Sequence, residues 1–479
     1  MKNTIFFSTE KGNTYLHHLD LSLSMWVHPE LSKAHKQMFN IEPYYDKKYT
    51  YLKEKGFFGE AKSIEFGTIL EKSVIENNIA QIPQISFETT DHCNLKCSYC
   101  SLGDLYTFSK KEHQNINTQY ALHLLKYIFN LKPKGAELTI GFFGGEPLAN
   151  GKFIRTIVEE VKRLNEEKKL NISFTITTNA TLINQYMDLL VNNNFFILIS
   201  LDGNKKGQSY RKFANNNENS FDKVIHNIDQ IYQKYPDFFK ENIRFNSVLH
   251  NQNSVQEIYE FIYNRYHKIP TIGSLNTDHV NPKKKELLDH IFQSRQASEE
   301  AFHKSNSNLL TIMHDQSIQF KELSDYLSDY SINFYMINIL DLLYDQVKPI
   351  PTKTCSPFQR KMYFSTNGRL LPCEKVSYKY FIGKVADIVE INIAEAAQRY
   401  SFYYKQIQKT CQHCYNWRTC SICLLTLDNL DDLGTDHFSC PNFLNGEAFG
   451  EKLETIFSFI ETNPNDFAWI IKERMLNKK

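Results

Sequence analysis

Residues 91–100 read Asp-His-Cys-Asn-Leu-Lys-Cys-Ser-Tyr-Cys and place three cysteines within eight residues, just after an apolar segment. Three thiolates this close together indicate a metal site. A [4Fe–4S] cluster normally takes four protein thiolates, and the next cysteine along the chain is Cys355. A cluster held here would leave one iron open to a small molecule. The alternatives are three buried thiols or a zinc knuckle, although structural zinc needs four ligands.

The spacing Cys93-x3-Cys97-x2-Cys100, with Tyr99 before the last cysteine, resembles the signature of the radical S-adenosylmethionine (radical SAM) enzymes. The resemblance implies that Cys93, Cys97 and Cys100 hold the catalytic cluster. It implies that S-adenosylmethionine (SAM) chelates the open iron and is reductively cleaved to a 5′-deoxyadenosyl radical, which abstracts a hydrogen atom from the substrate. Tyr99 would flank the adenine.

Length and composition narrow the remaining possibilities. A chain of 479 residues suggests two or three domains. The 55 basic and 54 acidic residues nearly cancel, so no bulk field favours nucleic acid or an anionic membrane. We see no signal peptide and no apolar run long enough to span a bilayer, and therefore predict a cytoplasmic protein. Ten cysteines in such a reducing compartment favour metal sites over disulfides.

From Ile82 onward, short β-rich runs alternate with helical periodicity, the pattern of βα units around a parallel sheet. The apolar run at 195–199 predicts a strand buried on both faces. The family resemblance implies a partial (β/α)6 TIM-like barrel at 81–275, with its chemistry at the carboxyl ends of the strands. The predicted strands span residues 84–90, 137–143, 171–178, 195–201, 242–249 and, less clearly, 270–275.

Polar motifs follow these strands in order. After the second strand, Gly144-Gly145-Glu146-Pro147 matches a family motif in which glycines let the backbone approach the cofactor and the following acceptors bind its ammonium group. Resemblance also implies roles at the ribose and carboxylate for polar groups at the ends of later strands, namely Asn179, Ser200 and Asp202. Arg244, on the fifth strand, is a further candidate for the cofactor carboxylate because a guanidinium matches a carboxylate bidentately. Alternatively, Asn179 and Asp202 cap the helices that follow, and Arg244 is an exposed strand arginine.

Within residues 1–80 the sequence predicts a hairpin at 3–18. It also predicts two short helices, one that starts at Pro29 and one at 49–55 that ends at Gly56. This unit resembles the winged-helix-like leader-recognition element of peptide-modifying enzymes. Its mode would be strand addition, with the peptide pairing along the open edge of the hairpin. The alternative is a structural apron that closes the bottom of the barrel.

Beyond the barrel we expect a helical bridging region at 276–350, including a helix at 334–343, and a C-terminal helix at 446–479. Residues 204–220 look like a polar loop with no clear chemistry. The Lys283-Lys284-Lys285-Glu286 cluster is expected to be a solvated helix face.

The remaining cysteines all fall within 351–445. Their order resembles the SPASM extension of radical SAM enzymes, which holds two auxiliary iron–sulfur clusters, although the last pair is spaced x2 where the family often has x3. The resemblance implies one set of four ligands and one of three, so that three [4Fe–4S] clusters use all ten cysteines. These sets are Cys411, Cys414, Cys420 and Cys440, and Cys355, Cys373 and Cys423. The three-cysteine cluster would have an open iron or a non-cysteine ligand, and the rival interpretation is a zinc ribbon.

Together these features are typical of a radical SAM/SPASM maturase that installs a crosslink or another modification, such as a thioether, on a ribosomally made precursor peptide. The implied partners are that peptide and an electron donor such as flavodoxin or ferredoxin. Two alternatives remain. One is a sulfatase-type maturase that forms formylglycine, although such enzymes usually have the cysteine loop near their start. The other is a non-catalytic iron–sulfur or zinc protein that binds peptide.

Overall fold

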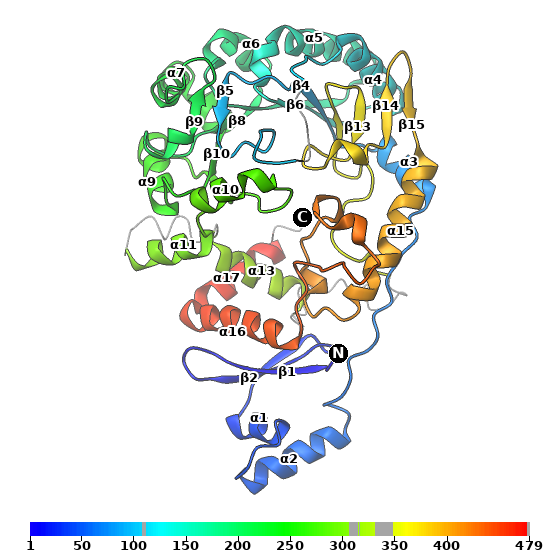
Figure 1. The fold of residues 1–479 in the computed structure, drawn as a ribbon, viewed down its shortest axis with the longest axis vertical. Coiled ribbons are helices and arrows are strands. Elements are labelled where there is room, and N and C mark those ends of the chain that lie inside the picture. Colours follow the sequence, from blue (N-terminus) through cyan, green and yellow to red (C-terminus); the bar gives the residue numbers. More distant parts are fainter. Residues whose placement is uncertain (108–111, 306–314, 316, 331–347, 477–479) are drawn as a thin grey trace.

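The computed structural model describes residues 1–107, 112–305, 315, 317–330 and 348–476. A large sheet with helices along its outer side occupies one end of the molecule, and a small N-terminal sheet occupies the other (Figure 1). The cysteine-rich C-terminal segment lies beside the large sheet, against its first strand. This arrangement is a mixed α/β fold built around an open, partial barrel.

All six predicted barrel strands are present and neighbouring strands are parallel. They follow the spatial order β11-β10-β8-β7-β6-β4, which is the chain order of consecutive βα units. The sheet does not close, because β4 pairs with the later strand β12 instead of β11. The strand bounds are β4 (Gln84–Thr90), β6 (Glu137–Gly144), β7 (Asn171–Thr178), β8 (Phe196–Ser200), β10 (Ile243–Val248) and β11 (Thr271–Gly273).

Helices cover the outer side of this sheet. Their predicted apolar stripes are buried: Ile128 in α4, Ile157 in α5 and Ile262 in α9 have no exposed surface. Spacing of apolar residues at i, i+3, i+4 and i+7 therefore identified the core-facing sides correctly. The helices of this layer are α3 (Lys72–Ala80), α4 (Thr118–Leu131), α5 (Gly151–Lys168), α6 (Met187–Asn192), α7 (Phe221–Lys234), α8 (Pro236–Asn242) and α9 (Val255–Tyr266).

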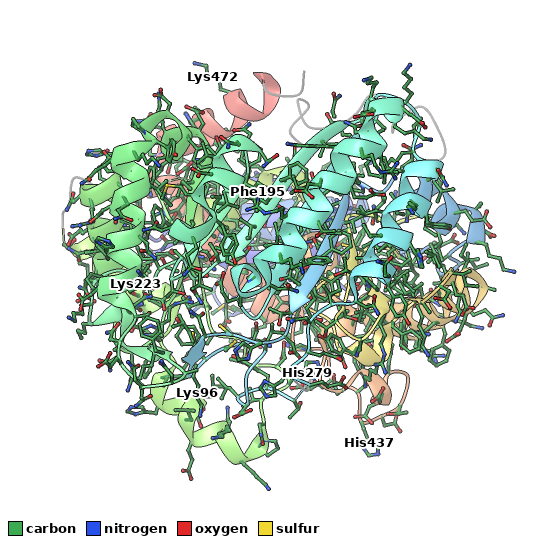
Figure 2. The ribbon with its side chains drawn as sticks, turned by 90° about the horizontal axis from the view of Figure 1, so that it is seen from above. Lys96, Phe195, Lys223, His279, His437 and Lys472 are labelled. Carbon is green, nitrogen blue, oxygen red and sulfur yellow. The ribbon has the colours of Figure 1, made fainter. Side chains whose placement is uncertain are left out.

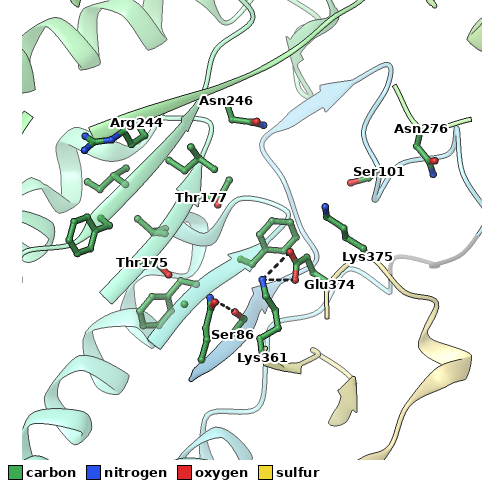
Figure 3. A pocket seen from close by; sticks show the side chains of 18 of the residues that line it. Ser86, Ser101, Thr175, Thr177, Arg244, Asn246, Asn276, Lys361, Glu374 and Lys375 are labelled. Carbon is green, nitrogen blue, oxygen red and sulfur yellow. Dashed lines mark hydrogen bonds and ion pairs between the residues drawn. The ribbon is translucent and has the colours of Figure 1, made fainter. Parts of the chain in front are cut away.

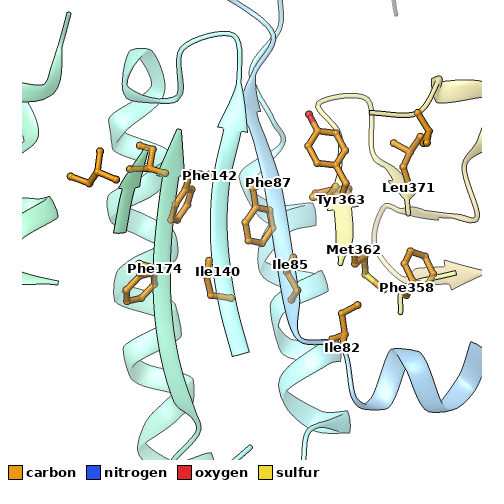
Figure 4. Close-up of a cluster of buried hydrophobic side chains, with 14 of the residues drawn as sticks. Ile82, Ile85, Phe87, Ile140, Phe142, Phe174, Phe358, Met362, Tyr363 and Leu371 are labelled. Atoms are coloured by element: carbon orange, nitrogen blue, oxygen red, sulfur yellow. The ribbon is translucent and has the colours of Figure 1, made fainter. Parts of the chain in front are cut away.

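Side chains alternate strictly across the barrel strands. Outward-facing residues such as Phe87, Phe142 and Phe174 pack under the helices (Figure 4). Inward-facing residues such as Ser86 and Thr175 line a cavity. The expectation that 195–199 is buried on both faces is wrong, because Phe196 points inward and keeps 47% of its surface exposed at the cavity. The apolar run was misleading because one face of this strand lines the cavity instead of packing in the core.

The C-terminal segment extends the barrel sheet. Strand β12 pairs in parallel with β4, and three antiparallel strands follow it. Glu88 of β4 fastens this junction, since its buried carboxylate accepts hydrogen bonds from the Tyr378 hydroxyl (2.6 Å) and the Thr366 amide (2.9 Å). The added elements are β12 (Met362–Phe364), β13 (Arg369–Leu371), β14 (Gly383–Val385), β15 (Val389–Ile391) and the helix α15 (Ile393–Cys411).

The N-terminal unit contains the predicted hairpin, β1 (Thr4–Ser8) and β2 (Thr14–His18), and a third strand, β3 (Leu23–Trp26), that pairs with β2. Helices α1 (Pro29–His35) and α2 (Pro43–Glu54) follow. Helix α2 begins six residues before the predicted start because Pro43 suits the first helical position. Ile5 and Phe7 pack in one hydrophobic cluster with residues of α13 and α16, whereas Ile75 and Ile79 further along pack in the barrel core.

The bridging region is helical where it is described: α10 (Lys285–Ile291), α11 (Arg295–Lys304) and α13 (Ile318–Asp329). The helix predicted at 334–343 lies outside the described residues. The prediction of a single C-terminal helix is wrong, because the chain forms two helices there, α16 (Gly446–Thr462) and α17 (Pro464–Leu476), with Pro464 at the start of the second. Among the described residues, no helix combines the length and apolar character needed to cross a membrane.

Candidate functional site

The three-cysteine loop begins where β4 ends. Its first residue, Asp91, is held in place by hydrogen bonds. The Asp91 carboxylate accepts them from three consecutive backbone amides, those of Glu112 (2.6 Å), His113 (3.0 Å) and Gln114 (2.8 Å). Cys97 ends the short strand β5 (Leu95–Cys97), which pairs with β9 (Arg211–Phe213). Burial is the main reason that the pKa of Cys97 is raised to about 12; Arg211 opposes the rise, and Cys100 and Cys93 contribute to it. The three thiols therefore lie close together at the carboxyl end of the barrel.

Two N–H groups point at the sulfur of Cys93. The Leu95 amide nitrogen lies 3.4 Å from Sγ, and the Asn179 side-chain nitrogen lies 3.8 Å from it. The same Asn179 nitrogen donates to the Asn94 side-chain oxygen at 2.9 Å, which fixes its direction. Donors at a cysteine sulfur favour its thiolate form. This loop therefore fits an iron–sulfur cluster, and Asn179 joins it from the end of β7.

Replacing Asn179 with aspartate is expected to weaken retention of the first cluster by about 10–100-fold, the usual range for outer-shell partners of a metal site. The change removes an N–H donor from Cys93 and places a second negative charge beside its thiolate. Iron retention in competition with a chelator measures the effect. Asn216→Asp, on an exposed turn, is the matched control and should match wild type. Equal retention in both variants would contradict the assigned role of Asn179.

Gly144 and Gly145 lie against the cysteine loop itself. A Cβ added to Gly144, which has φ +128°, would lie 2.2 Å from the Thr90 carbonyl oxygen, and one added to Gly145 would lie 2.1 Å from that of His92. The Gly145 amide donates to Thr90 O at 2.8 Å and the Glu146 amide to His92 O at 2.9 Å. These glycines therefore allow a close approach to the chain's own backbone just before Cys93.

Glu146 is fully buried and serves the protein's own groups. Its carboxylate accepts hydrogen bonds from the Thr178 hydroxyl (2.7 Å), the Asn179 amide (2.8 Å) and the Leu148 amide (3.1 Å). Pro147, buried beside it, begins a short 3-10 turn. Burial raises the pKa of Glu146 to about 7, although the three hydrogen bonds oppose the rise. Glu146 therefore connects the glycine turn to the end of β7 through its hydrogen bonds to Thr178 and Asn179.

This raised pKa predicts a pH dependence of stability. Between about pH 4.5 and pH 7 the folded chain keeps a proton that an unfolded glutamate releases, so the contribution of Glu146 falls as pH rises through this window. The slope reaches at most about 1.4 kcal/mol per pH unit. Urea denaturation of wild type and Glu146→Gln at several pH values should show their stability difference changing within this window and constant above it. A difference independent of pH would contradict the raised pKa.

A buried ion pair supports the other side of the loop. Asp202, after β8, binds Arg211 through two hydrogen bonds, Nε to Oδ2 at 2.8 Å and Nη2 to Oδ1 at 3.1 Å. The Tyr99 hydroxyl also donates to Asp202, and His250 stacks on the Tyr99 ring with centroids 5.5 Å apart. Burial opposes ionisation of Asp202, but Arg211 and His250 outweigh it and hold the pKa of this carboxyl well below its usual range.

This network revises several expectations. Neither Asn179 nor Asp202 caps a helix, since Leu182 and Lys206 hold the cap positions that follow. Residues 204–220 contain β9, whose Arg211 lies directly across from Cys97, so the prediction of a loop without chemistry is wrong there. Arg211 and His250 were missed by the sequence analysis. The one signal that could have indicated them is the carboxylate of Asp202 itself, because a buried carboxylate is normally paired with a cation.

A cavity of about 990 Å³ opens inside the barrel. It extends from Ser101, next to Cys100, to Thr426 and Lys375 in the C-terminal segment (Figure 3). Glu374 pairs with Lys361 across its wall at 3.1 Å. Asp278 and His279 also line it, and Figure 2 shows His279 on the same side of the molecule as Lys96 of the cysteine loop. Burial and then Asp428 raise the pKa of Asp278.

Two strand residues with predicted cofactor roles lie at different depths of this barrel. Ser200 ends β8 and pairs in register with Asn246, an inward-facing cavity residue. Arg244 is the second residue of β10 and donates to the carbonyls of Ile243 (2.9 Å) and Lys240 (3.3 Å). It therefore lies toward the amino end of the strand, where it lines the same cavity that Ser101 borders (Figure 3).

The seven C-terminal cysteines are free thiols and fall into two groups. Burial raises the pKa of Cys411, and Cys420, Cys414 and Cys440 raise it further in that order. Burial raises the pKa of Cys423, and Cys355 contributes to the rise. Burial also raises the pKa of Cys373, and Cys423 is among the groups that contribute to the rise. These neighbourhoods match the predicted sets of four and three. Within the described residues, no three or more Cys, His, Asp or Glu side chains converge on the position of a single metal ion.

Comparison with known proteins identifies the central region. The radical SAM superfamily profile matches residues 87–262, from β4 to α9. This region therefore matches the radical SAM domain, and that match implies SAM and one [4Fe–4S] cluster. A solved structure described as native anSMEcpe with bound AdoMet and Kp18Cys peptide has a TM-score of 0.55 at 18% identity, covering 81% of this chain and 99% of that one. At this identity the likeness concerns the fold.

Similar sequences include two named enzymes. The cysteine-type anaerobic sulfatase-maturating enzyme of Clostridium novyi (strain NT) is 30% identical over 220 residues, which is 42% of this chain and 56% of that protein. The radical SAM cyclopropyl synthase TigE of Paramaledivibacter caminithermalis is 28% identical over 182 residues, 35% of this chain and 36% of TigE. The chain thus spans about a third to just over half of these curated relatives.

Proposed function

We propose that this protein is a radical SAM peptide maturase, which reductively cleaves SAM and abstracts a hydrogen atom from a ribosomally made peptide to install a crosslink or another modification. The observation that carries the proposal is the cavity between the cysteine loop and the C-terminal cysteines. At about 990 Å³ it has the size of a ligand site and admits a peptide side chain with its neighbours.

The cluster and SAM supply, when bound, a 5′-deoxyadenosyl radical. The chain's own residues do the positioning. Cys93, Cys97 and Cys100 would hold the cluster, Asn179 donates toward Cys93, and Asp202 and Arg211 hold Tyr99 beside it. The apolar wall formed by Phe196 and Leu198 limits water at the inner end of the cavity. Such positioning and exclusion are what a protein adds to a cofactor's chemistry.

The two cysteine groups of the C-terminal segment support two auxiliary [4Fe–4S] clusters, three clusters in all. One would use Cys411, Cys414, Cys420 and Cys440, and the other Cys355, Cys373 and Cys423. They would accept the electron left on the product, relay electrons from a donor such as flavodoxin or ferredoxin, or bind the peptide. An open iron on the second cluster would bind a substrate thiolate and so favour thioether formation.

The N-terminal unit would bind the leader part of the peptide. Strand β3 is paired on one side by β2, and its Trp26 is 71% exposed. A peptide in extended conformation would add to the outer edge of β3 with main-chain hydrogen bonds. Because its first strand packs on α13 and α16, the small sheet would hold a leader while the following residues reach the cavity.

The experiment is an anaerobic reaction of the reconstituted protein with SAM, a reductant and a candidate precursor peptide encoded beside its gene, analysed by mass spectrometry. The proposal expects 5′-deoxyadenosine and a peptide whose mass falls by two hydrogens, as a crosslink requires, or changes by another defined modification. Removal of residues 1–54, which keeps α3 on the barrel, should leave cofactor cleavage detectable and weaken modification of the full-length peptide. Cofactor cleavage with no change in any candidate peptide would contradict the maturase proposal.

A second candidate is oxidation of a Cys or Ser side chain to formylglycine. The observation that favours it is the similarity to sulfatase-maturating enzymes in sequence and fold. The position of the cysteine loop argues against this candidate. In sulfatase-type maturases the loop usually lies near the start, whereas here about 80 residues precede the barrel. Incubation with a sulfatase-derived cysteine peptide distinguishes the two, because this candidate requires an aldehyde that hydrazine reagents trap, whereas the maturase proposal requires none.

A further inference from the structure

Helix α15 carries two buried tyrosines one turn apart. Tyr400 and Tyr404 expose only 2% and 1% of their surfaces. Within the described residues neither hydroxyl oxygen has a hydrogen-bond partner. A buried phenol without a partner is costly and rare in native structures. Two on one face of one helix indicate a site at which a bound group would accept hydrogen bonds from them.

Both phenols face the three-cysteine group. Burial raises the pKa of Tyr404, and Cys355 and Cys423 raise it further. Burial likewise raises the pKa of Tyr400, followed by Tyr404, Cys423 and Cys373. Tyr400 and Tyr404 also belong to the buried cluster against which Cys373 and Cys423 pack, so the two phenols and the three-cysteine group occupy one region of the core. The two rings meet edge to face, with centroids 6.1 Å apart, and so hold each other in place.

The neighbouring Tyr403 shows that this placement is specific. It is only half-buried, and its surroundings are Tyr380, Arg399 and Asp431 instead of any cysteine. Tyr400 and Tyr404 share a helix face because they are four residues apart, whereas Tyr403 points in another direction. The same helix therefore provides two tyrosines that face the thiols and one matched tyrosine that does not.

We propose that the hydroxyls of Tyr400 and Tyr404 donate hydrogen bonds to the sulfur atoms of an iron–sulfur cluster held by Cys355, Cys373 and Cys423, and thereby raise its reduction potential. The inference rests on the auxiliary cluster proposed above. Reduction adds negative charge to a cluster, and a donor at its sulfurs stabilises that charge. A set of only three cysteine ligands makes such fixed donors useful, because they also orient the cluster within the site.

The test uses the full chain, reconstituted anaerobically, with Cys93, Cys97 and Cys100 replaced by alanine so that only the auxiliary clusters remain. A redox titration followed by electron paramagnetic resonance then reports two midpoint potentials. In this background Tyr400→Phe, Tyr404→Phe and the double variant are compared with Tyr403→Phe. Iron content is measured for each, and about eight irons per chain correspond to two clusters.

The proposal expects one of the two potentials to become more negative in each single variant and further in the double variant. The other potential, the iron content and the Tyr403→Phe control should not change. Unchanged potentials in the double variant would overturn it. So would the loss of about four irons from a single variant, because that result makes a phenolate oxygen a ligand instead of a donor. If the cysteine-to-alanine background holds no iron while wild type still cleaves SAM, the auxiliary assignment fails and the radical SAM chemistry stands.

Discussion

Replacing Arg211 with methionine is expected to lower the free energy of unfolding by about 3–5 kcal/mol, the usual cost of leaving one partner of a buried ion pair uncompensated. Asp202 has no exposed surface and takes both of its charged hydrogen bonds from this guanidinium. Arg211 also lies across from Cys97 in the β5–β9 pair, so the cysteine loop should loosen as well. Urea denaturation and iron content measure the two effects.

The chain offers a matched control. Arg265 binds Asp229 through two similar hydrogen bonds, but its side chain is 43% exposed, so Arg265→Met should cost no more than about 1 kcal/mol. Adding Asp202→Asn to Arg211→Met removes the stranded charge and should restore part of the lost stability. Equal losses from Arg211→Met and Arg265→Met would show that burial of the first pair has no energetic consequence, contrary to its assigned role.

Gly145→Ala is expected to destabilise the protein by about 3 kcal/mol, the upper range for overpacking, and to lower the iron content of the first cluster. The new Cβ would lie 2.1 Å from the His92 carbonyl oxygen and 2.4 Å from its carbon, so the backbone just before Cys93 must move. That movement would also break the hydrogen bond between the Gly145 amide and Thr90 O. Urea denaturation and iron content again provide the measurement.

Gly59→Ala is the control for this change. Its added Cβ would meet only the Asn3 side-chain nitrogen at 3.9 Å, an ordinary contact, so stability and iron content should remain at the wild-type level. A Gly145→Ala protein that retains its full iron content and stability would mean that the two loops separate freely. The Gly-Gly-Glu-Pro turn would then not support the cysteine loop.

The barrel could be predicted from the sequence because its signals are local. The bounds of β4 and β7 agree with the prediction to the residue, since β-rich runs end there at the cysteine loop and at the Thr-Asn turn. The grouping of the C-terminal thiols came from the family resemblance, and the electrostatic neighbours of Cys411 and Cys423 agree with it. Periodicity and short-range spacing therefore identified the elements, and the metal ligands stay a prediction.

What the sequence did not indicate depends on long-range register. Arg211 reaches Asp202 and Cys97 only because β9 pairs with β5, more than one hundred residues earlier in the chain. Glu146 looked like a cofactor ligand, yet Thr178 and Asn179 occupy its oxygens. Phe196 looked like core, yet it faces the cavity. In each case the partner of the residue is set by packing between distant segments, which no local pattern contains.

The central claim is that this chain performs radical SAM chemistry through three iron–sulfur clusters. The most direct measurement is to reconstitute the protein anaerobically, count iron and sulfide, and assay 5′-deoxyadenosine formation by wild type and Cys97→Ala. The account predicts about twelve irons per chain and formation of 5′-deoxyadenosine that is lost in the variant. A protein that holds about two zinc ions and does not cleave SAM would contradict it and favour a peptide-binding zinc protein instead.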